Sequence, residues 1–359
     1  MQLGVNVNPR QGFKAADIAA PGVTWVRTVL LPPDKIHLTA DDSFDEDSMM
    51  EDWITDCHLN NLKVLGVIAR ESLRRGWTYK AAARRYRAAY GLPGRVGSLD
   101  AWQIGNEPDL RSPSSWTMRP ERLNRLLWAF RAEMPDAAII GPGLASGNPD
   151  YVRGMDLNAI GNIAIHCYGQ RPLPDFPAPD WGFGEVQTLL DLYREVTSKP
   201  IVVSEFGGPE RDFTDEHERA RYHSEMLLAL RDAGVEVAMQ FCLSDRMVPG
   251  FGLWDENDVP KESAAAFFDG ARAIAERAAA PIILDYRGQL PTRGTQRYSK
   301  RPIGGVTHAC IHWTAGSASA TVEDVARYQT GPGSHLPFPE IAYHLYVGPD
   351  GEVSWCHSF

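Results

Sequence analysis

The chain has 359 residues, a formal net charge of −10 and a sequence pI near 5.5. An acidic chain lacks the basic surface that a phosphate backbone requires, which excludes nucleic acid as the expected partner. No apolar run approaches the roughly 18 residues of a membrane-spanning helix, and the amino-terminal segment has no signal-peptide pattern. The five cysteines are scattered and lack CxxC spacing, which predicts free thiols and synthesis in the reducing cytoplasm.

Strand-forming segments recur eight times in the first 275 residues. Between them lie segments with apolar residues at helical spacing, such as Tyr79–Tyr90, Glu121–Ala132, Phe183–Val196 and Asp215–Asp232. The eight expected strands are Leu3–Asn8, Thr24–Leu30, Leu62–Ala69, Ala101–Asp109, Ala138–Leu144, Asn162–Gly169, Pro200–Gly208 and Val237–Asp245. This alternation predicts an α/β chain folded as a closed (β/α)8 TIM barrel, with its active site at the carboxyl ends of the strands. An open doubly wound sheet is the alternative, but no glycine-rich phosphate loop follows the first strand.

Two of the expected strands lead into glutamates. The segment Trp102–Pro108 contains Glu107, and the segment Ile201–Gly208 contains Glu205. The interval between them leaves room for about three strand-helix units of roughly 30 residues each, which places the glutamates on strands four and seven. Two carboxylates facing each other across a pocket suit glycosidic bond cleavage, because one protonates the leaving oxygen while the other attacks or activates water.

These features resemble the clan A retaining glycoside hydrolases, a family of TIM-barrel β-glycosidases, over roughly residues 1 to 275. The sequence Asn106-Glu107-Pro108 matches the family's fourth strand, and Ser204-Glu205 matches its seventh. The resemblance implies that Glu107 is the acid/base, that Glu205 is the nucleophile and that Asn106 contacts the sugar 2-hydroxyl. It also implies a carbohydrate substrate and no cofactor for the barrel.

Further matches to this family surround the two glutamates. Arg27 falls near the end of the second strand, His166 and Tyr168 lie on the sixth, and Trp254 follows the eighth. The resemblance implies that Arg27 keeps Glu205 ionised and that His166 and Tyr168 orient the nucleophile or the sugar hydroxyls. The family often has a tryptophan platform at the end of strand eight, where this chain has Phe241. Trp254 is then the candidate platform, unless the subsite is built differently.

The last part of the chain has another character. We expect the barrel to end at residue 278 and residues 279–305, rich in Arg, Gly and Pro, to form a linker. A strand containing His312 follows, then a short helix at Val322–Gln329. Ile341–Val347 and Glu352–Trp355 flank the turn Gly348-Pro349-Asp350-Gly351, which predicts a β-hairpin.

Residues 306–359 resemble the first part of a zinc-dependent N-acetylmuramoyl-L-alanine amidase of the phage and peptidoglycan-recognition type. The match rests on Ile311-His312-Trp313-Thr314-Ala315 and Ala342-Tyr343-His344-Leu345. The resemblance implies that His312 is a zinc ligand and Tyr343 a catalytic residue. The family's other zinc ligands lie beyond the hairpin, and a catalytic zinc needs about three protein ligands. This region is therefore expected to be a partial α+β amidase-like module, with zinc bound in a complete one.

Three functions follow from these patterns. The first is a peptidoglycan-degrading lysin that joins a retaining glycosidase to an amidase module and reaches the cell wall by lysis or on a virion. The second is a β-glycosidase acting on a polysaccharide unrelated to the cell wall. The third is a noncatalytic carbohydrate-binding barrel that targets an amidase; the presence of both Glu107 and Glu205 argues against it.

Overall fold

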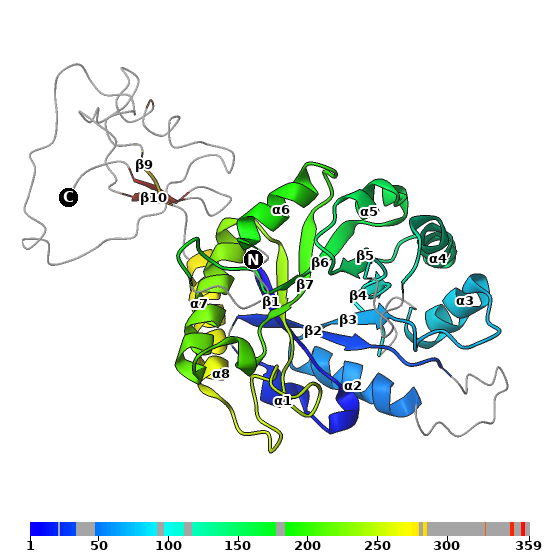
Figure 1. The fold of residues 1–359 in the computed structure, drawn as a ribbon, viewed down its shortest axis with the longest axis horizontal. Coiled ribbons are helices and arrows are strands. Elements are labelled where there is room, and N and C mark those ends of the chain that lie inside the picture. Colours follow the sequence, from blue (N-terminus) through cyan, green and yellow to red (C-terminus); the bar gives the residue numbers. More distant parts are fainter. Residues whose placement is uncertain are drawn as a thin grey trace, which may run out of the picture. The chain divides into compact units, whose positions relative to one another are not determined.

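The computed structural model describes residues 1–20, 22–33, 47–91, 97–110, 117–176, 184–279, 283–285, 327, 345–347 and 353–355. These residues belong to two compact units, Met1–Glu276 and Arg277–Phe359. The first unit is a barrel of strands surrounded by helices (Figure 1).

Eight parallel strands close the barrel in sequence order, with β1 paired to β8. Their bounds are β1 Gln2–Asn6, β2 Val23–Val29, β3 Lys63–Ile68, β4 Ala101–Ile104, β5 Ile139–Leu144, β6 Asn162–Tyr168, β7 Ile201–Gly207 and β8 Val237–Gln240. The predicted TIM barrel is confirmed, and the open-sheet alternative is wrong.

Two strands are much shorter than the sequence predicts. The fourth ends at Ile104 rather than Asp109, because Gly105 at φ 102° and Glu107 at φ 48° leave the extended region of backbone space. The eighth ends at Gln240, after which the chain runs into a loop where Ser244 bridges Trp254. In both cases polar or functional residues lie just beyond the strand, at the carboxyl end of the barrel.

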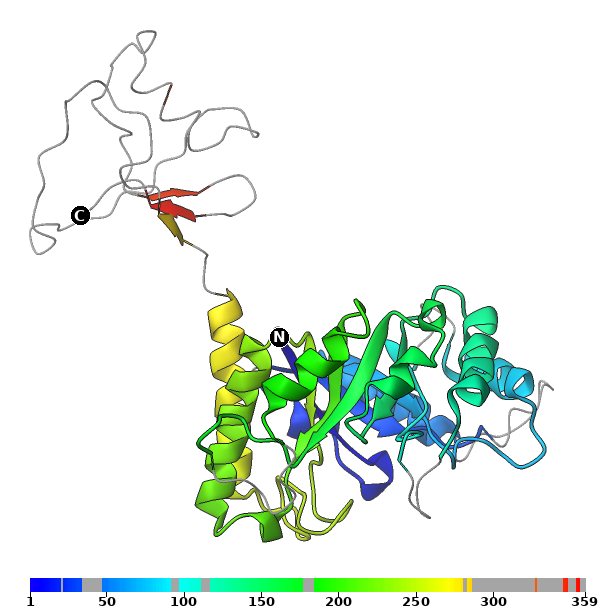
Figure 2. The ribbon, with the colours of Figure 1, turned by 45° about the horizontal axis from the view of Figure 1, so that its top comes forward.

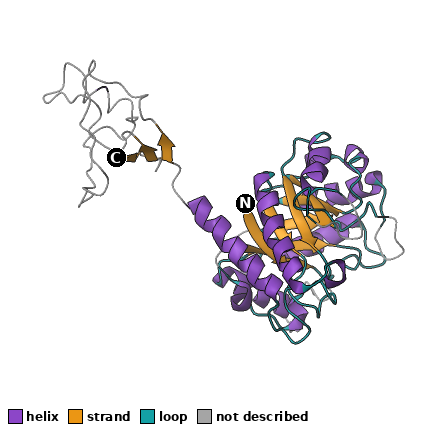
Figure 3. Ribbon diagram, turned by 60° about the vertical axis from the view of Figure 1, so that its left-hand side comes forward, coloured by secondary structure: helices purple, strands orange, loops and turns teal. Residues whose placement is uncertain are grey.

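Helices lie outside the strands of this unit (Figure 3). The four helices expected from apolar spacing are confirmed as α3, α4, α6 and α7. Side chains mark where two of them begin, since Thr78 accepts from the Ala81 amide and Asp215 from the Glu218 amide. No helix among the described residues is both long and apolar enough to cross a membrane. The bounds are α1 Ala15–Ile18, α2 Asp47–Leu59, α3 Tyr79–Tyr90, α4 Pro120–Glu133, α5 Asp150–Arg153, α6 Val186–Arg194, α7 Glu216–Asp232 and α8 Glu262–Ala279.

Apolar side chains fill the barrel interior, so it is a packed core rather than a pore. One buried cluster takes a side chain from each of β3 to β8: Leu65, Ala101, Ile140, Ala164, Val202 and Met239. Side chains two residues further along a strand point to the same side. Gln103 and His166 therefore follow Ala101 and Ala164 into the interior, on the carboxyl side of the apolar layer.

A larger apolar cluster packs the helices against the outside of the barrel, for example where Tyr86 of α3 meets Trp102 of β4 and Phe130 of α4. Cys57, Cys167 and Cys242 are buried free thiols, as expected from the sequence. Cys310 and Cys356 lie outside the described residues.

The second unit contains a three-stranded sheet in the order β10-β11-β9 (Figure 2). Its strands are β9 Ile283–Asp285, β10 Leu345–Val347 and β11 Val353–Trp355. β10 and β11 pair antiparallel, which confirms the predicted pairing of the hairpin strands. β9 pairs parallel with β11, so part of the expected linker is a strand. The expected helix at Val322–Gln329 lies, apart from Arg327, outside the described residues.

Candidate active site

A β-bulge on β7 aims Glu205 into the barrel. On β6, consecutive residues Ile165 and His166 pair with Val203 and Glu205, so Ser204 is an extra residue on β7. Between Val203 and Phe206, β7 also has one residue more than the stretch of β8 that pairs with it. Strict alternation would put Val202 and Ser204 inside and Glu205 outside. The bulge lets Val202 and Glu205 share the interior, a re-aiming that bulges often perform next to active sites.

Glu205 is a buried carboxylate with three partners. Its residue is 5% exposed, and Arg27 donates to its Oε1 at 2.5 Å while Tyr168 donates its hydroxyl to Oε2. The Nε2 atom of His166 lies 3.4 Å from Oε1. Burial raises the pKa of Glu205, but His166, Arg27 and Tyr168 outweigh it, and the pKa is lowered overall. Glu205 is therefore held in its anionic form.

Tyr168 stabilises the anionic form of Glu205 by donating a hydrogen bond to it. Burial and the neighbouring Glu205 charge hold the pKa of Tyr168 well above its ordinary value. The phenol thus keeps its proton and donates it in the hydrogen bond to the carboxylate. The Tyr168 ring meets Phe241 edge-on at 5.9 Å and Phe251 at 6.0 Å, which fixes its orientation.

Glu107 lies in the turn after β4 and is more accessible. Its side chain is 27% exposed, against 7% for Glu205. The backbone N–H donates to the Gly143 carbonyl on β5 at 2.8 Å, and Oε1 lies 2.9 Å from His166 Nδ1. Glu107 is thus fixed at both its backbone and its carboxyl, with a face left open to solvent.

The two carboxylates meet across His166. One oxygen from each glutamate and one ring nitrogen of His166 lie within 4.8 Å of one another. Retaining glycosidases hold their carboxyl groups about 5 to 5.5 Å apart, and inverting enzymes about 6.5 to 9.5 Å apart. The close approach of these oxygens favours the spacing of double displacement over the wider inverting one.

Arg27 joins the strands on the Glu205 side of the site. It is 2% exposed and donates to Gln103 at 2.9 Å, to Asn106 Oδ1 at 2.7 Å and to Asn6. Because the Asn106 oxygen is occupied, the Nδ2 group of Asn106 remains to donate to a ligand. Asn6 and Gln103 were not among the predicted site residues. A polar side chain inside an otherwise apolar strand is the signal that would have revealed each of them.

The aromatic residues near the site fall into two groups, and the predicted platform role of Trp254 stays a prediction. Trp254 packs edge-on against Phe13 at 5.6 Å, and within the described ranges no hydrogen bond or ring contact joins it to either glutamate. Phe241 and Phe251, 5.7 Å apart, lie against Tyr168 instead. Phe251 was missed, since its Gly-Phe-Gly context carries no recognisable signal.

The loop that presents Phe251 is tied to α7. Arg219 is fully buried and donates to the carbonyls of Phe251 at 2.9 Å and Gly252 at 3.0 Å. Lys261 crosses the base of the same loop to reach Asp245 at 2.6 Å and Glu210 at 2.5 Å. A buried guanidinium that satisfies loop carbonyls gives this aromatic wall a fixed support.

One group of three residues in the described part of the chain has the spacing of metal ligands: Glu107, His166 and Glu205. However, both oxygens of Glu205 already accept hydrogen bonds from Arg27 and Tyr168. A cation there would also lie beside the guanidinium, so the arrangement favours a carboxylate pair over a metal centre. The predicted zinc ligand His312 and the predicted catalytic Tyr343 lie outside the described residues.

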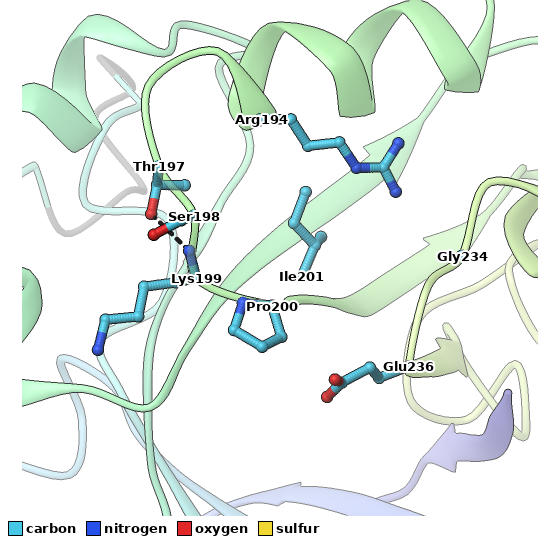
Figure 4. A pocket seen from close by; sticks show the side chains of 8 residues that line it. All are labelled: Arg194, Thr197, Ser198, Lys199, Pro200, Ile201, Gly234 and Glu236. Atoms are coloured by element: carbon cyan, nitrogen blue, oxygen red, sulfur yellow. Dashed lines mark hydrogen bonds between the residues drawn. The ribbon is translucent and has the colours of Figure 1, made fainter.

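A separate cavity of about 390 Å³ opens at the amino end of β7 (Figure 4). Its lining consists of Arg194, Thr197, Ser198, Lys199, Pro200, Ile201, Gly234 and Glu236. Ile201 begins β7, whereas Glu205 is near its carboxyl end. TIM-barrel active sites lie at the carboxyl face, so this cavity is not part of the carboxylate site.

Comparison with solved structures places the barrel among glycoside hydrolase folds. A family 39 glycoside hydrolase from Bacteroides cellulosilyticus WH2 matches at TM-score 0.58 and 17% identity, over 76% of this chain and 64% of that one. An exo-β-1,4-mannosidase from Opitutaceae bacterium strain TAV5 matches at 0.57 and 18%, over 79% and 62%. A psychrophilic family 10 endo-β-1,4-xylanase matches at 0.52 and 16%, over 75% and 96%. At these identities the likeness is one of fold.

The chain therefore has a TIM-barrel fold like that of these glycoside hydrolases, and it spans less than two thirds of the length of the first two of them. No protein-family model matches the sequence. The comparison with curated proteins likewise gives no match.

Proposed function

We propose that residues 1–276 form a retaining β-glycoside hydrolase in which Glu205 is the nucleophile and Glu107 the acid/base. The observation that carries this proposal is the pair of carboxylates within 4.8 Å in unlike environments. Glu205 is buried among proton donors and stays ionised, while Glu107 faces solvent and can exchange a proton. A buried, charge-paired carboxylate and a solvent-facing one suit the two roles of a double displacement.

The reaction proceeds in two balanced steps. In the first, a carboxylate oxygen of Glu205 attacks the anomeric carbon as the glycosidic bond breaks, and Glu107 gives its proton to the departing oxygen. In the second, Glu107 takes a proton from water, whose oxygen attacks the same carbon and displaces Glu205. The net reaction adds one water and releases two hydroxyl-bearing sugars with the anomeric configuration retained.

Neighbouring residues have supporting roles in this proposal. Arg27 and Tyr168 hold the Glu205 carboxylate in the attacking position through the bonds described above. Asn106, with its oxygen bound to Arg27, donates from Nδ2 to the sugar 2-hydroxyl. Hydrogen bonds at that hydroxyl strengthen in the transition state. Phe241 and Phe251 offer an apolar wall for a sugar face.

For the substrate, we favour a β-linked polysaccharide. Two of the structural neighbours are described as an exo-β-1,4-mannosidase and an endo-β-1,4-xylanase, which supports this class without selecting a sugar. The second candidate is the glycan strand of peptidoglycan. The amidase-like sequences around His312 and Tyr343 favour it, since an amidase module beside a glycosidase would attack the same polymer at two bonds.

The test is hydrolysis of aryl β-glycosides, β-linked polysaccharides and purified peptidoglycan by the full chain. NMR of early products should show the β-anomer first, and mass spectrometry of the peptidoglycan digest should show new reducing ends if the wall is the substrate. Free lactyl-muramic acid groups would instead reveal amidase action. An α-anomer formed first, or absence of hydrolysis across all three substrate sets, would rule out the retaining β-glycosidase.

A further inference from the structure

Gly143 on β5 lies against the ring that separates the two carboxylates. A Cβ atom built on Gly143 would stand 2.1 Å from His166 Nε2 and 2.9 Å from Cδ2 and Cε1 of the same ring. Such distances do not occur between unbonded atoms, so any side chain at this position would displace the imidazole. The imidazole is fully buried and lies between Glu107 and Glu205, so it cannot move away without disturbing one of them.

The same glycine also holds the acid/base through its backbone. Its carbonyl accepts the N–H of Glu107 at 2.8 Å, and it bridges Asn106 in parallel pairing. Glu107 needs such an anchor because its φ of 48° is a left-handed conformation that a residue with a Cβ seldom adopts. Gly143 therefore acts on Glu107 twice, directly through its carbonyl and indirectly by leaving room for His166.

A bulge brings Gly143 to this position. Ile140 pairs with Asn162 and Gly143 pairs with Ala164, so β5 carries one more residue than β6 over this stretch. Ile140 belongs to the inner apolar cluster, and the extra residue allows Gly143, three positions later, to meet the inward-facing His166.

We propose that Gly143 is a positioning residue for the acid/base: its missing side chain sets the place of His166 and, through it, of the Glu107 carboxyl. This inference rests on the proposed glycosidase function. It predicts that the larger loss falls on proton transfer, because Arg27 and Tyr168 still hold Glu205 when His166 moves, whereas His166 is the side chain that holds the Glu107 carboxyl.

The experiment compares Gly143→Ala with Gly161→Ala as a matched control. A Cβ on Gly161 meets nothing closer than the Ile139 carbonyl at 3.7 Å, so the control should retain wild-type rates. For Gly143→Ala, kcat/KM on aryl glycosides with poor leaving groups should fall about 100-fold, the scale of general acid catalysis. On dinitrophenyl glycosides, whose leaving group needs no proton, it should fall less than about threefold. Equal losses on both substrates, or no loss on either, would overturn the positioning role.

A double-mutant cycle covers the case in which Gly143→Ala folds poorly. His166→Ala vacates the space that the new methyl group would occupy, so Gly143→Ala should cost little further activity or stability in that background. A full additional loss in the double variant would show that the methyl clashes elsewhere and would refute the proposal. Lack of hydrolysis by the wild-type chain would instead reject the glycosidase function and leave the steric test readable from thermal stability in the same cycle.

Discussion

The two glutamates of the site occupy unlike regions of one barrel. Glu205 belongs to a strand, is nearly inaccessible and has both carboxylate oxygens occupied by fixed donors. Glu107 belongs to a turn, has a left-handed backbone and keeps a quarter of its side chain in solvent. The contrast shows how a protein gives one residue type two environments, since buried charge must be paired whereas a proton-transfer group must reach solvent or substrate.

The largest effect is expected when the buried glutamate, Glu205, loses its charge. Glu205→Gln keeps the shape of the side chain but removes the nucleophile, so kcat should fall on the order of 10⁴-fold or more. Glu236→Gln, at the opposite end of the barrel, is the matched control and should retain activity. Steady-state kinetics on an aryl β-glycoside measures both, and appreciable turnover by Glu205→Gln would remove it from the nucleophile role.

Replacement of the more exposed glutamate, Glu107, should lower activity in a different manner. Glu107→Ala should lower kcat/KM by about 10² to 10⁴-fold on poor leaving groups, the usual contribution of general acid catalysis, and by much less on dinitrophenyl glycosides. Azide should restore turnover on the activated substrates and yield a β-glycosyl azide, detectable by mass spectrometry. An α-glycosyl azide, or equal loss on all leaving groups, would contradict this assignment.

Removing a single donor to Glu205 should have an intermediate effect. Tyr168→Phe deletes a hydrogen bond to a charged group, worth about 1.5 to 3 kcal/mol, so kcat should fall about 10- to 100-fold. This bond helps to lower the pKa of Glu205, so its loss raises that pKa. Because the ionised form is the active one, the acidic limb of the kcat/KM profile should move to higher pH.

The control for this prediction is Tyr193→Phe. The Tyr193 hydroxyl is buried without a hydrogen-bond partner among the described residues, so its removal should leave the profile in place. An acidic limb that moves to lower pH in Tyr168→Phe would show that the phenol does not stabilise the Glu205 carboxylate.

The smallest effect is expected at Trp254. Its contact is with Phe13, so Trp254→Phe, which keeps a ring there, should change kcat/KM less than about threefold. Phe251→Ala should raise KM by about tenfold, since it removes part of the apolar wall beside Tyr168. The reverse order of effects would make Trp254 the sugar platform.

The barrel and its two glutamates could be predicted because they follow from local patterns. The period of the apolar residues and the lengths of the segments predicted the strands, and Glu107 and Glu205 lie in segments that the sequence pattern predicts to be buried strands. Asn6 and Gln103 were less visible, because a partner such as Arg27 is recognised only after the barrel closes. The position of Phe251 depends on the hydrogen bond from Arg219 to its carbonyl. That bond joins a helix to a loop, and no sequence spacing predicts it. The extra residues on β5 and β7 arise from pairing with neighbours and leave no periodic signal.

The bulge at Ser204 makes the direction of the Glu205 side chain depend on one extra residue. Glu205 lies three steps from Val202 and still shares its face, because the extra residue interrupts the alternation once. Without the bulge but with all residues kept, the same three steps would turn the carboxylate toward the helices. A one-residue deletion there would restore regular alternation and keep Glu205 inward, two steps from Val202, so comparisons of related chains should accept a one-residue gap at this point and still align the glutamates.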